Sequence, residues 1–572
     1  MKGERIMIET KLYNSLISVM PNLDLNTMGI KKVIMCKNQP LSFQMAYKIT
    51  DNSRRDISFF MKITSDLEIS NYYVGYVPLI HTDYANLQPV VPIGMYPDIL
   101  LPKKSNPKIV PKSAWSDIQY FEKDEKVKLT AYNDCCQSVW FTINENSKNL
   151  KGGIYKIKIE LYSNQNVFMG SNELTVEVLD EKLPAQKLKY TNWFHHDCLV
   201  DKYKVQLFSE EYFKIMVNYL EKAVKNGMNM VLLPAFTPPL DTPVGEERMT
   251  VQLVKVKVDN GKYQFDFRLM KKYIDICKSV GIKYFEHSHF FTQWGARFAP
   301  KIVAEVDGKE KRIFGWDTKA TGKKYVSFLR QYITELKKFL KEEKLEKKML
   351  FHISDEPDES CIKEYSAARK IVADLLDGYD IGDALSDVKF YDEGYCSTPI
   401  AATPFIHDFI GKCDNLWAYY IGWWTMGGTS NRLIQMPRER NRMLGIQLYY
   451  YNIKGFLQWA FNYYYGYMSQ YFSNPVITPC GAFPGAGTSY MVYPSDDGDA
   501  YQSVRLKTFS EGLIDMRALV LLEKLAGRDI CNKIIHKHFG EPRFNCSPDN
   551  PQDYTDFINE LYQCIKNYSK KQ

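Results

Sequence analysis

The sequence lacks the short motifs that mark several common classes of enzyme site. Its 12 cysteines form no CxxC pair and no regular framework, which argues against a disulfide scaffold and against a close pair of cysteine metal ligands. There is no HExxH motif, no EF-hand loop and no GxSxG elbow. The glycines from Gly481 to Gly487 lack the strand–GxxxxGK[ST]–helix arrangement of a phosphate-binding loop. The signatures of zinc peptidases, calcium sites, P-loops and serine hydrolases are therefore missing.

Charge of one sign and long apolar runs are scarce as well. The net charge is +7 over 572 residues, and basic residues are mixed with acids, as from Lys337 to Lys348. Such a run is typical of the solvated end of a helix, so no nucleic-acid partner is predicted. No apolar run is long enough to cross a bilayer, and Met1 to Pro21 lacks the apolar core of a signal peptide. Together with dispersed thiols, this predicts a cytoplasmic protein without a membrane partner, and it leaves homo-oligomerisation open.

Aromatic residues are abundant, at 14% of the chain, with 40 Tyr and 9 Trp. Hydrophobic residues make up 45% and charged residues 25%, as in ordinary globular proteins, and the length predicts two or more domains. Most of the rings are expected in the cores of these domains. Tyr and Trp also suit stacking on a flat ligand while offering a polar group.

Residues 1–183 are predicted to form an N-terminal β-sandwich domain. Apolar residues alternate with polar ones from Tyr155 to Leu161 and from Leu174 to Val178, which indicates strands with one wet face. Turn signals such as Lys151-Gly152-Gly153 separate the runs. The polar segment Glu181 to Gln186, which contains a proline, is the predicted domain boundary.

From residue 187 to 526 the pattern changes to alternating helices and strands. Apolar residues recur at helical spacing from Tyr212 to Ala223, and the apolar run from Met228 to Leu233 follows. About eight such units predict a parallel sheet closed into a (β/α)8 TIM-like barrel, so the fold class is α/β. The predicted strands are 189–193, 228–233, 283–287, 349–353, 388–391, 416–421, 456–461 and 491–494. Residues 527–572 are predicted to form a short helical C-terminal tail.

The most informative segment runs from Met349 to Pro357. Its apolar start predicts a buried strand, and Pro357 ends the strand and biases Glu356 toward an extended backbone. Asp355 and Glu356 therefore fall at the C-terminal tip of a barrel strand, the edge where barrel enzymes build their active sites. Neighbouring acids repel each other, and partial burial separates their pKa values, so one can donate a proton while the other stays charged. Glycoside hydrolysis uses such a pair, although the same acids could instead cap the following helix.

Other predicted strand tips carry aromatic rings beside hydrogen-bonding groups, which suits the apolar faces and hydroxyl rim of a sugar. These residues are His195 and Asp197 after the first strand, Glu286 and His287 in the third, Tyr391 in the fifth, Tyr419 and Trp423 in and after the sixth, and Trp459 and Asn462 in and after the seventh. His287 and His289 also have the spacing of metal ligands on a strand. Histidines that bind hydroxyl groups explain the pattern without a metal, so neither a metal ion nor a cofactor is predicted.

With these residues in place, the chain resembles glycoside hydrolase family 123, whose catalytic domain also appears in proteins that carry the DUF4091 label. The resemblance runs from about Tyr190 to Leu525 and depends on the shared order of several short segments. These segments are Trp193 to Cys198, His289 to Gly295, His352 to Pro357, Ser430 to Pro437, Tyr451 to Trp459 and Glu511 to Asp515.

The resemblance implies an exo-acting hydrolase that removes terminal β-N-acetylgalactosamine (a β-N-acetylhexosamine) and retains configuration by substrate assistance. Adjacent Cα atoms are about 3.8 Å apart, so Asp355 and Glu356 approach one side of a sugar more easily than they straddle it. The acetamide oxygen of the substrate would attack the anomeric carbon and give an oxazolinium-like intermediate, an exception to the two-carboxylate scheme. Glu356 would protonate the leaving oxygen and later deprotonate water. Asp355 would hold the acetamide N–H and stabilise the developing positive charge.

An aromatic pocket for the acetamide methyl group is expected from Tyr391, Tyr419, Trp423 and Trp459. The candidate hydroxyl binders are His195, Asp197, Glu286, His287 and Asn462. Two alternatives remain open. One is a conventional glycosidase without acetamide participation, which would use Asp392 or Glu393 as a distant carboxylate. The other is a non-catalytic carbohydrate-binding protein on a barrel scaffold.

Overall fold

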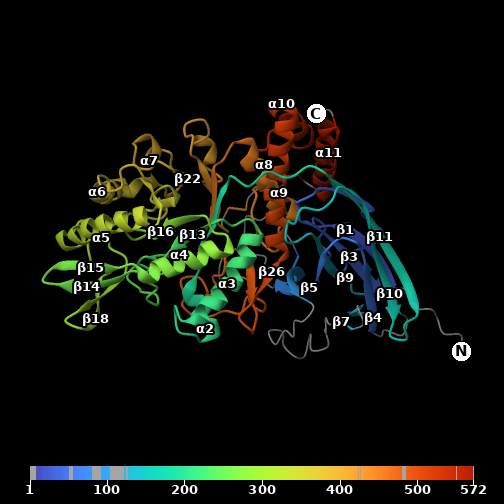
Figure 1. Cartoon of the computed structure of the whole chain (residues 1–572), viewed down its shortest axis with the longest axis horizontal. Coiled ribbons are helices and arrows are strands. Elements are labelled where there is room, and N and C mark those ends of the chain that lie inside the picture. The colour runs from blue at the N-terminus through green and yellow to red at the C-terminus, as the bar shows by residue number, and fades with distance from the viewer. Residues whose placement is uncertain are drawn as a thin grey trace.

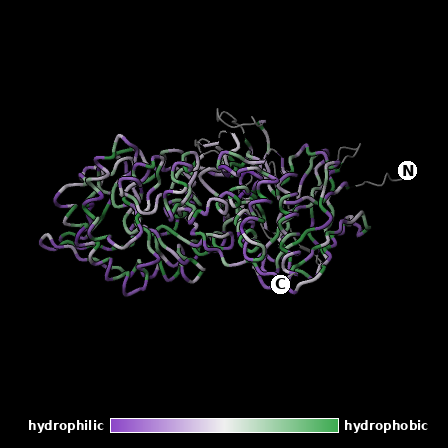
Figure 2. The backbone as a smooth tube through the Cα atoms, turned by 90° about the horizontal axis from the view of Figure 1, so that it is seen from above, coloured by the Kyte–Doolittle hydropathy of each residue, from purple (hydrophilic) through white to green (hydrophobic). Residues whose placement is uncertain are grey.

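The computed structural model describes residues 8–49, 56–79, 92–102, 122–123, 126–422, 424–425, 427–479, 485–548 and 550–570. An all-β lobe and an α/β lobe stand side by side, and a group of C-terminal helices lies between them at one edge (Figure 1). Hydrophobic and hydrophilic residues are interleaved over short distances in both lobes (Figure 2). None of the helices in the described ranges combines the length and apolar composition that a membrane span requires.

The all-β lobe, called here the two-sheet lobe, contains two mainly antiparallel sheets. One has the strand order β1-β3-β9-β5-β6-β26-β25, and the other has the order β2-β11-β10-β4-β8-β7, with β2 parallel to β11. The bounds are β1 (Ile8–Asn14), β2 (Lys32–Cys36), β3 (Leu41–Ile49), β4 (Ile57–Thr64), β5 (Ile69–Leu79), β6 (Gly94–Pro102), β7 (Glu122–Lys123), β8 (Lys126–Ala131), β9 (Gln137–Ile143), β10 (Gly153–Ser163), β11 (Phe168–Leu179), β25 (Val492–Pro494) and β26 (Ala500–Ser503).

The strands of this lobe follow the alternation seen in the sequence. In β10 the side chains of Ile157, Ile159 and Leu161 are buried, whereas Lys156 and Lys158 are exposed. Apolar residues from both sheets belong to one hydrophobic cluster. The two predicted strands in this stretch are confirmed as β10 and β11.

The α/β lobe is built on a curled parallel sheet with the strand order β20-β19-β16-β13-β12-β24-β23-β22-β21. The bounds are β12 (Lys189–Asn192), β13 (Met230–Leu233), β16 (Tyr284–His287), β19 (Met349–Phe351), β20 (Asp380–Ile381), β21 (Ala384–Leu385), β22 (Ile400–Ala402), β23 (Trp417–Tyr419) and β24 (Gly455–Gln458). The strands at the two ends of this order, β20 and β21, are separated along the chain only by Gly382 and Asp383. The sheet therefore curls until its opposite edges are joined by these two residues.

Helices connect most of these strands and also form the C-terminal region. They are α2 (His196–Tyr203), α3 (Glu210–Lys225), α4 (Arg268–Val280), α5 (Lys323–Glu342), α6 (Ile362–Val372), α7 (Lys389–Asp392), α8 (Arg438–Tyr450), α9 (Val504–Ala526), α10 (Arg528–Phe539) and α11 (Pro551–Ser569). The predicted helix from Tyr212 to Ala223 lies within α3, which begins after Ser209 because that side chain accepts a hydrogen bond from the Tyr212 N–H.

A small sheet that the sequence did not predict projects from the α/β lobe beside α5 (Figure 1). It has the strand order β15-β14-β17-β18. The bounds are β14 (Lys255–Asp259), β15 (Lys262–Asp266), β17 (Ile302–Val306) and β18 (Lys309–Phe314). The strands belong to the long segments that follow β13 and β16, so this sheet extends the same end of the lobe as the polar strand tips.

Two predicted strands were wrong. Residues 388–391 lie at α7, where the Asp387 carboxylate accepts a hydrogen bond from the Lys389 N–H, 2.9 Å away, and forms a turn just before the helix. The strands that follow β19 are instead β20, β21 and β22, which are too short to give a period in the sequence. Residues 491–494 include β25, which pairs with β26 in antiparallel register and belongs to the two-sheet lobe.

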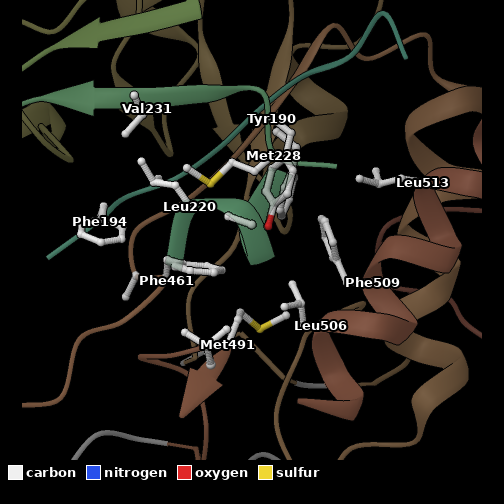
Figure 3. Packing of buried hydrophobic residues seen from close by; sticks show 14 of the residues in the cluster. Tyr190, Phe194, Leu220, Met228, Val231, Phe461, Met491, Leu506, Phe509 and Leu513 are labelled. Atoms are coloured by element: carbon white, nitrogen blue, oxygen red, sulfur yellow. The ribbon is translucent and has the colours of Figure 1, made fainter. Parts of the chain in front are cut away.

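Helix α9 lies between the lobes and packs closely against α8. A Cβ atom built at Gly445 of α8 would lie 1.8 Å from the Gly512 carbonyl oxygen of α9, so this approach requires glycine. Leu506, Phe509 and Leu513 of α9 face the base of the curled sheet, where Tyr190 lies at the start of β12 (Figure 3). The Tyr190 and Phe509 ring centroids are 4.9 Å apart. The two lobes therefore share a continuous core, which fixes the base of the parallel strands.

Candidate active site

A pocket of about 820 Å³ opens among the C-terminal tips of the curled sheet. It is lined by Trp193, Asp241, Gln293, Trp294, Asp355, Glu356, Ala384, Tyr419, Ile421, Gly422, Leu457, Trp459, Tyr467, Met468 and Thr488. These residues lie in or after β12, β13, β16, β19, β21, β23 and β24, so most of the sheet contributes to one cavity.

Asp355 and Glu356 stand side by side on the wall of this pocket, in the loop after β19. The Trp294 N–H donates a hydrogen bond of 2.9 Å to the Asp355 carbonyl oxygen and ties this loop to the one after β16. Glu356 has a φ angle of 42°, so the prediction that Pro357 would keep it extended was wrong. Tertiary contacts here outweigh the local preference before a proline, as is common for strained residues at functional sites.

Tyr419, at the end of β23, holds the Glu356 side chain. Its hydroxyl donates a hydrogen bond of 2.8 Å to Glu356 Oε1. By contrast, the Asp355 carboxylate has no side-chain hydrogen bond from any residue in the described part of the chain. One acid of the pair is therefore oriented by the protein, and the other can accept a hydrogen bond from a ligand.

Burial dominates the electrostatics of the pair. It raises the pKa of Asp355 well above its usual range, and the nearby Glu356 and Asp241 carboxylates raise it further. Burial also raises the pKa of Glu356, against which the Tyr419 hydrogen bond acts. Because neighbouring carboxylates cannot both ionise easily in a buried pocket, burial favours a form of the pair that holds one proton.

A buried chain of polar groups supports the pocket from behind. His352 Nε2 lies 3.0 Å from Glu286 Oε2, and His352 Nδ1 lies 3.5 Å from Asp383 Oδ1. Glu286 also accepts hydrogen bonds from the Thr191 hydroxyl and, at 3.0 Å, from Trp193 Nε1. Burial lowers the pKa of His352, but the contacts of its ring with the Asp383 and Glu286 carboxylates outweigh this effect and raise the pKa to about 9. Glu286 thus orients Trp193 on the pocket wall and does not itself line the pocket.

His289, His352 and Asp383 come close enough for one atom of each to approach a common metal ion. The two imidazole rings are stacked, however, with centroids 4.6 Å apart and an angle of 25° between the rings. Their ring lone pairs therefore lie in two nearly parallel planes. Asp383 already accepts hydrogen bonds from the Ile353 N–H and the Tyr365 hydroxyl, at 2.9 and 2.5 Å. The Asp383 carboxylate is therefore engaged by the protein, whereas His289 Nδ1 and His352 Nδ1 are buried without a hydrogen-bond partner among the described residues.

A second polar network borders the pocket after β13. Arg248 donates two hydrogen bonds to Asp197 Oδ2, at 2.9 and 2.6 Å, and its guanidinium lies over the Tyr463 ring. Asp241 lies between this network and the pocket. Burial raises the pKa of Asp241 to about 7, and Arg248 acts in the opposite direction.

The remaining predicted site residues fall into three groups. Tyr419 and Trp459 line the pocket, whereas His195 and Asp197 line the smaller cavity beside it. Asn462 is buried, and its side chain binds the backbone N–H and carbonyl of His195, at 2.9 and 3.0 Å. Asn462 therefore shapes the loop after β12.

Like Glu286 and Asn462, two further predicted residues do not line the pocket. The Tyr391 hydroxyl, on α7, donates to the Lys412 carbonyl oxygen at 3.1 Å, because the segment forms a helix and not a strand. His287 is buried against Tyr332, whose hydroxyl is 2.8 Å from its Nε2, because the side chain points into the helix layer. Trp423 lies outside the described residues.

Sequence reasoning missed several residues that the pocket uses. Asp241 of the pocket and Arg248 of the cavity beside it follow β13 in a long segment without periodicity, and Tyr467 and Met468 lie far along the chain after β24. A shared signal exists in the backbone: Asp241, Trp294 and Met468, like Glu356, have φ angles between 42° and 59°. Such values are uncommon for residues other than glycine and concentrate at functional sites.

Comparison with curated proteins gave no match. Among solved structures, a family 123 glycoside hydrolase from Clostridium perfringens, described for glycolipid glycan hydrolysis, matches with a TM-score of 0.71 and 15% identity over 99% of each chain. This likeness shows a shared fold. A β-glucuronidase from Parabacteroides merdae matches with a TM-score of 0.32 and 10% identity, over 89% of this chain and 52% of that one. That weaker likeness carries no argument.

The family comparison agrees with the pocket. The model described as "Glycoside hydrolase 123, catalytic domain" matches residues 193–522, which is more than half of the chain. The matched range begins at Trp193 on the pocket wall and includes Asp355, Glu356, Tyr419 and Trp459. The chain belongs to glycoside hydrolase family 123 and is a glycoside hydrolase.

Proposed function

We propose that this enzyme removes terminal β-N-acetylgalactosamine, as an exo-acting β-N-acetylhexosaminidase that retains configuration. The observation that carries the proposal is the position of Asp355 and Glu356, side by side on the wall of one pocket. Adjacent acids do not easily flank a glycosidic bond from opposite faces, as the usual two-carboxylate scheme requires. The acetamide group of the substrate would take the place of the protein nucleophile.

In the first step, the acetamide oxygen attacks the anomeric carbon and the bond to the leaving oxygen breaks. Glu356 gives its proton to that oxygen, while Asp355 accepts a hydrogen bond from the acetamide N–H. This hydrogen bond favours the ionised form of Asp355 and opposes the burial that raises its pKa in the empty pocket. The proton of the pair would then reside on Glu356, and Asp355 would stabilise the positive charge of the oxazolinium ring.

In the second step, Glu356 takes a proton from the water molecule that opens the ring. Two displacements at the anomeric carbon give net retention. Tyr419, Trp459 and Trp193 supply apolar walls that suit the acetamide methyl group and the C–H faces of the sugar. Because the C. perfringens relative is described for glycolipid glycans, we propose a glycan with a terminal N-acetylhexosamine as the substrate class.

A conventional glycosidase mechanism is the second candidate, and one observation favours it. A third carboxylate, Asp241, lines the same pocket. Its charge raises the pKa of Asp355, and the charge of Glu356 in turn raises the pKa of Asp241. In this mechanism Asp241 would be the distant carboxylate, in place of Asp392 and Glu393. Those two residues are unsuitable because α7 does not reach the pocket and Asp392 pairs with Lys412 at 3.0 Å. This mechanism would not need an acetamide group.

The fold supports the proposal that the curled sheet is a (β/α)8 barrel preceded by a β-sandwich domain. If β20 and β21 are taken as one interrupted strand, the described residues contain eight parallel positions, with the pocket at their C-terminal ends. The connections are shorter than usual around β22. We also keep the cytoplasm as a proposed location, in accord with the 11 cysteines in the described ranges, which are free thiols.

The stereochemistry of hydrolysis tests the proposed function. An aryl β-N-acetylgalactosaminide should be cleaved, and proton NMR of the first product should show the β-anomer before mutarotation. The Asp392→Asn variant, altered outside the pocket, should behave like the parent enzyme. Appearance of the α-anomer first, or no hydrolysis of any aryl β-N-acetylhexosaminide, would overturn the proposal.

A further inference from the structure

Asp241 occupies a position that the mechanism above does not use. It follows β13 and lines both the active-site pocket and a side cavity of about 410 Å³. Its side chain is 19% exposed, so the carboxylate is mostly withdrawn from bulk water. It lies on the boundary between a rigid polar network and the space for the substrate.

The Asp241 carboxylate has hydrogen-bonding capacity that the protein leaves unused. A carboxylate can accept about four hydrogen bonds. Within the described residues, the hydrogen bond that reaches it comes from Arg248 Nη1 at a long 3.4 Å, and His195 Nδ1 lies 4.0 Å away. A buried carboxylate without close partners is costly, and burial accordingly raises its pKa.

The Arg248 guanidinium beside this carboxylate is itself held in place by other groups. The Arg248 guanidinium is fixed by its two hydrogen bonds to Asp197, and Arg248 Nη1 also donates to the Leu240 carbonyl oxygen at 3.3 Å. The Asp241 backbone has a φ angle of 59°, which few residues other than glycine adopt. Strain and burial are thus both tolerated at a residue whose acceptor oxygens border the pocket.

A sugar hydroxyl group is the ligand chemistry that fits these oxygens. It is neutral, donates a hydrogen bond, and would relieve the poor solvation of the carboxylate without adding charge to a pocket that already holds two acids. Asp355 and Glu356 act at C2 and C1 of the sugar in the proposed function, so the hydroxyl groups left for Asp241 are those at C3, C4 and C6.

We propose that Asp241 binds a hydroxyl group at C3, C4 or C6 of the terminal sugar and sets which hexosamine the pocket accepts. Arg248 and Asp197 position it. The inference rests on the proposed hexosaminidase function and deepens it. A site built around a hydrogen bond to a hydroxyl group discriminates strongly against an analogue that lacks it, because the buried acceptor is then left unpaired.

The test compares aryl β-N-acetylgalactosaminides in which the hydroxyl at C3, C4 or C6 is replaced in turn by hydrogen. The parent enzyme should lose about 10- to 100-fold in kcat/KM on one of the three analogues, the range expected for a hydrogen bond to a charged group. The Asp241→Asn and Asp241→Gly variants should lose a similar factor on the intact substrate and little more on that analogue. Asparagine and glycine both tolerate the left-handed backbone, so the pair guards against a folding defect in either one.

The control is Asp374→Asn, which removes an exposed carboxylate paired with Arg330 at 2.8 Å. This variant should leave kcat/KM for each analogue, relative to the intact substrate, as it is in the parent enzyme. Equal losses on the intact substrate and all three analogues would overturn the inference and assign Asp241 to the conventional mechanism. The inference would also be overturned if both Asp241 variants kept the parent enzyme's kcat/KM for each analogue relative to the intact substrate. Failure of the hexosaminidase function would look different, because the parent enzyme would cleave none of these substrates.

Discussion

The Tyr419 hydroxyl lies 2.8 Å from Glu356 Oε1 and donates a hydrogen bond to it, across the pocket from β23 to the loop after β19. This bond favours the charged form of Glu356 and lowers its pKa against the effect of burial. Tyr419 therefore does more than form an apolar wall, because it sets the acidity of the proposed proton donor.

Tyr419→Phe should raise the pKa of Glu356. A general acid must be protonated, so activity falls as the pH rises through its pKa, and a higher pKa moves that fall to higher pH. The measurement is kcat/KM against pH for the parent and the variant. An alkaline limb that stays in place, or moves to lower pH, would contradict this role for Tyr419.

Glu356→Gln should lose about 100- to 10,000-fold in kcat/KM on substrates whose leaving group needs protonation. On an aryl glycoside with a strongly acidic phenol, the first step needs little help from an acid, so the loss in that step should be smaller. Single-turnover measurements of phenol release over a series of phenols test this. The same loss for every leaving group would show that Glu356 is not the acid.

Asp355→Asn should be badly impaired on N-acetylhexosaminides, although the acid Glu356 remains. Asparagine cannot supply the negative charge that stabilises the oxazolinium ring, and we expect a loss of at least about 100-fold in kcat. Circular dichroism should show an intact fold. Near-normal turnover in this variant would mean that the role assigned to Asp355 is wrong.

The sequence was most informative where buried strands end in polar residues. The apolar run before Asp355 and Glu356 predicts β19, and the aromatic tips of β23 and β24 predict Tyr419 and Trp459 on the same side of the sheet, as found. The catalytic roles of these residues stay predictions. The strands β20 to β22 could not be predicted, because segments of two or three residues show no period.

The parts of the pocket that come from long loops could not be read from the sequence. Asp241 and Arg248 become neighbours through a single tertiary arrangement between β13 and β14, and no local pattern marks them. Glu286 shows the reverse limitation: a strand-tip acid looks like a ligand-binding residue, but its side chain turns inward to Trp193 and His352. The spacing of residues in the sequence shows which of them lie at the C-terminal end of the sheet. It does not show which of their side chains face the pocket.

The buried contact between His352 and Glu286 should make stability depend on pH. The pKa of His352 is raised from 6.5 to about 9 in the folded state. Its charged form therefore stabilises the fold below about pH 6.5, and this contribution is lost as the pH rises through about 9. His352→Gln should cost about 3–5 kcal/mol at pH 6 and clearly less at pH 9.5, as measured by chemical denaturation. An equal cost at both values would show that His352 is neutral in the fold.

Asp241 should also make stability fall as the pH rises, but over a lower pH range. Its pKa is raised from 3.8 to about 7 by burial, so the folded state binds a proton more readily than the unfolded chain between these values. Stability from this group falls as the pH rises from about 4 to 7. Asp241→Asn should therefore be more stable than the parent at pH 8, by roughly 2–4 kcal/mol, and similar to it at pH 4. A variant that is less stable at pH 8 would show that the Arg248 contact outweighs burial.

Dependence on the acetamide group tests the central claim most directly. The measurement is kcat/KM for an aryl β-N-acetylgalactosaminide against the matched β-galactoside, which has a hydroxyl group at C2. If the substrate supplies the nucleophile from within, the N-acetyl compound should react at least about 1,000-fold faster, because the intramolecular attack replaces a step that the protein does not provide. Similar rates for the two compounds would contradict the account and transfer the nucleophilic role to a protein carboxylate.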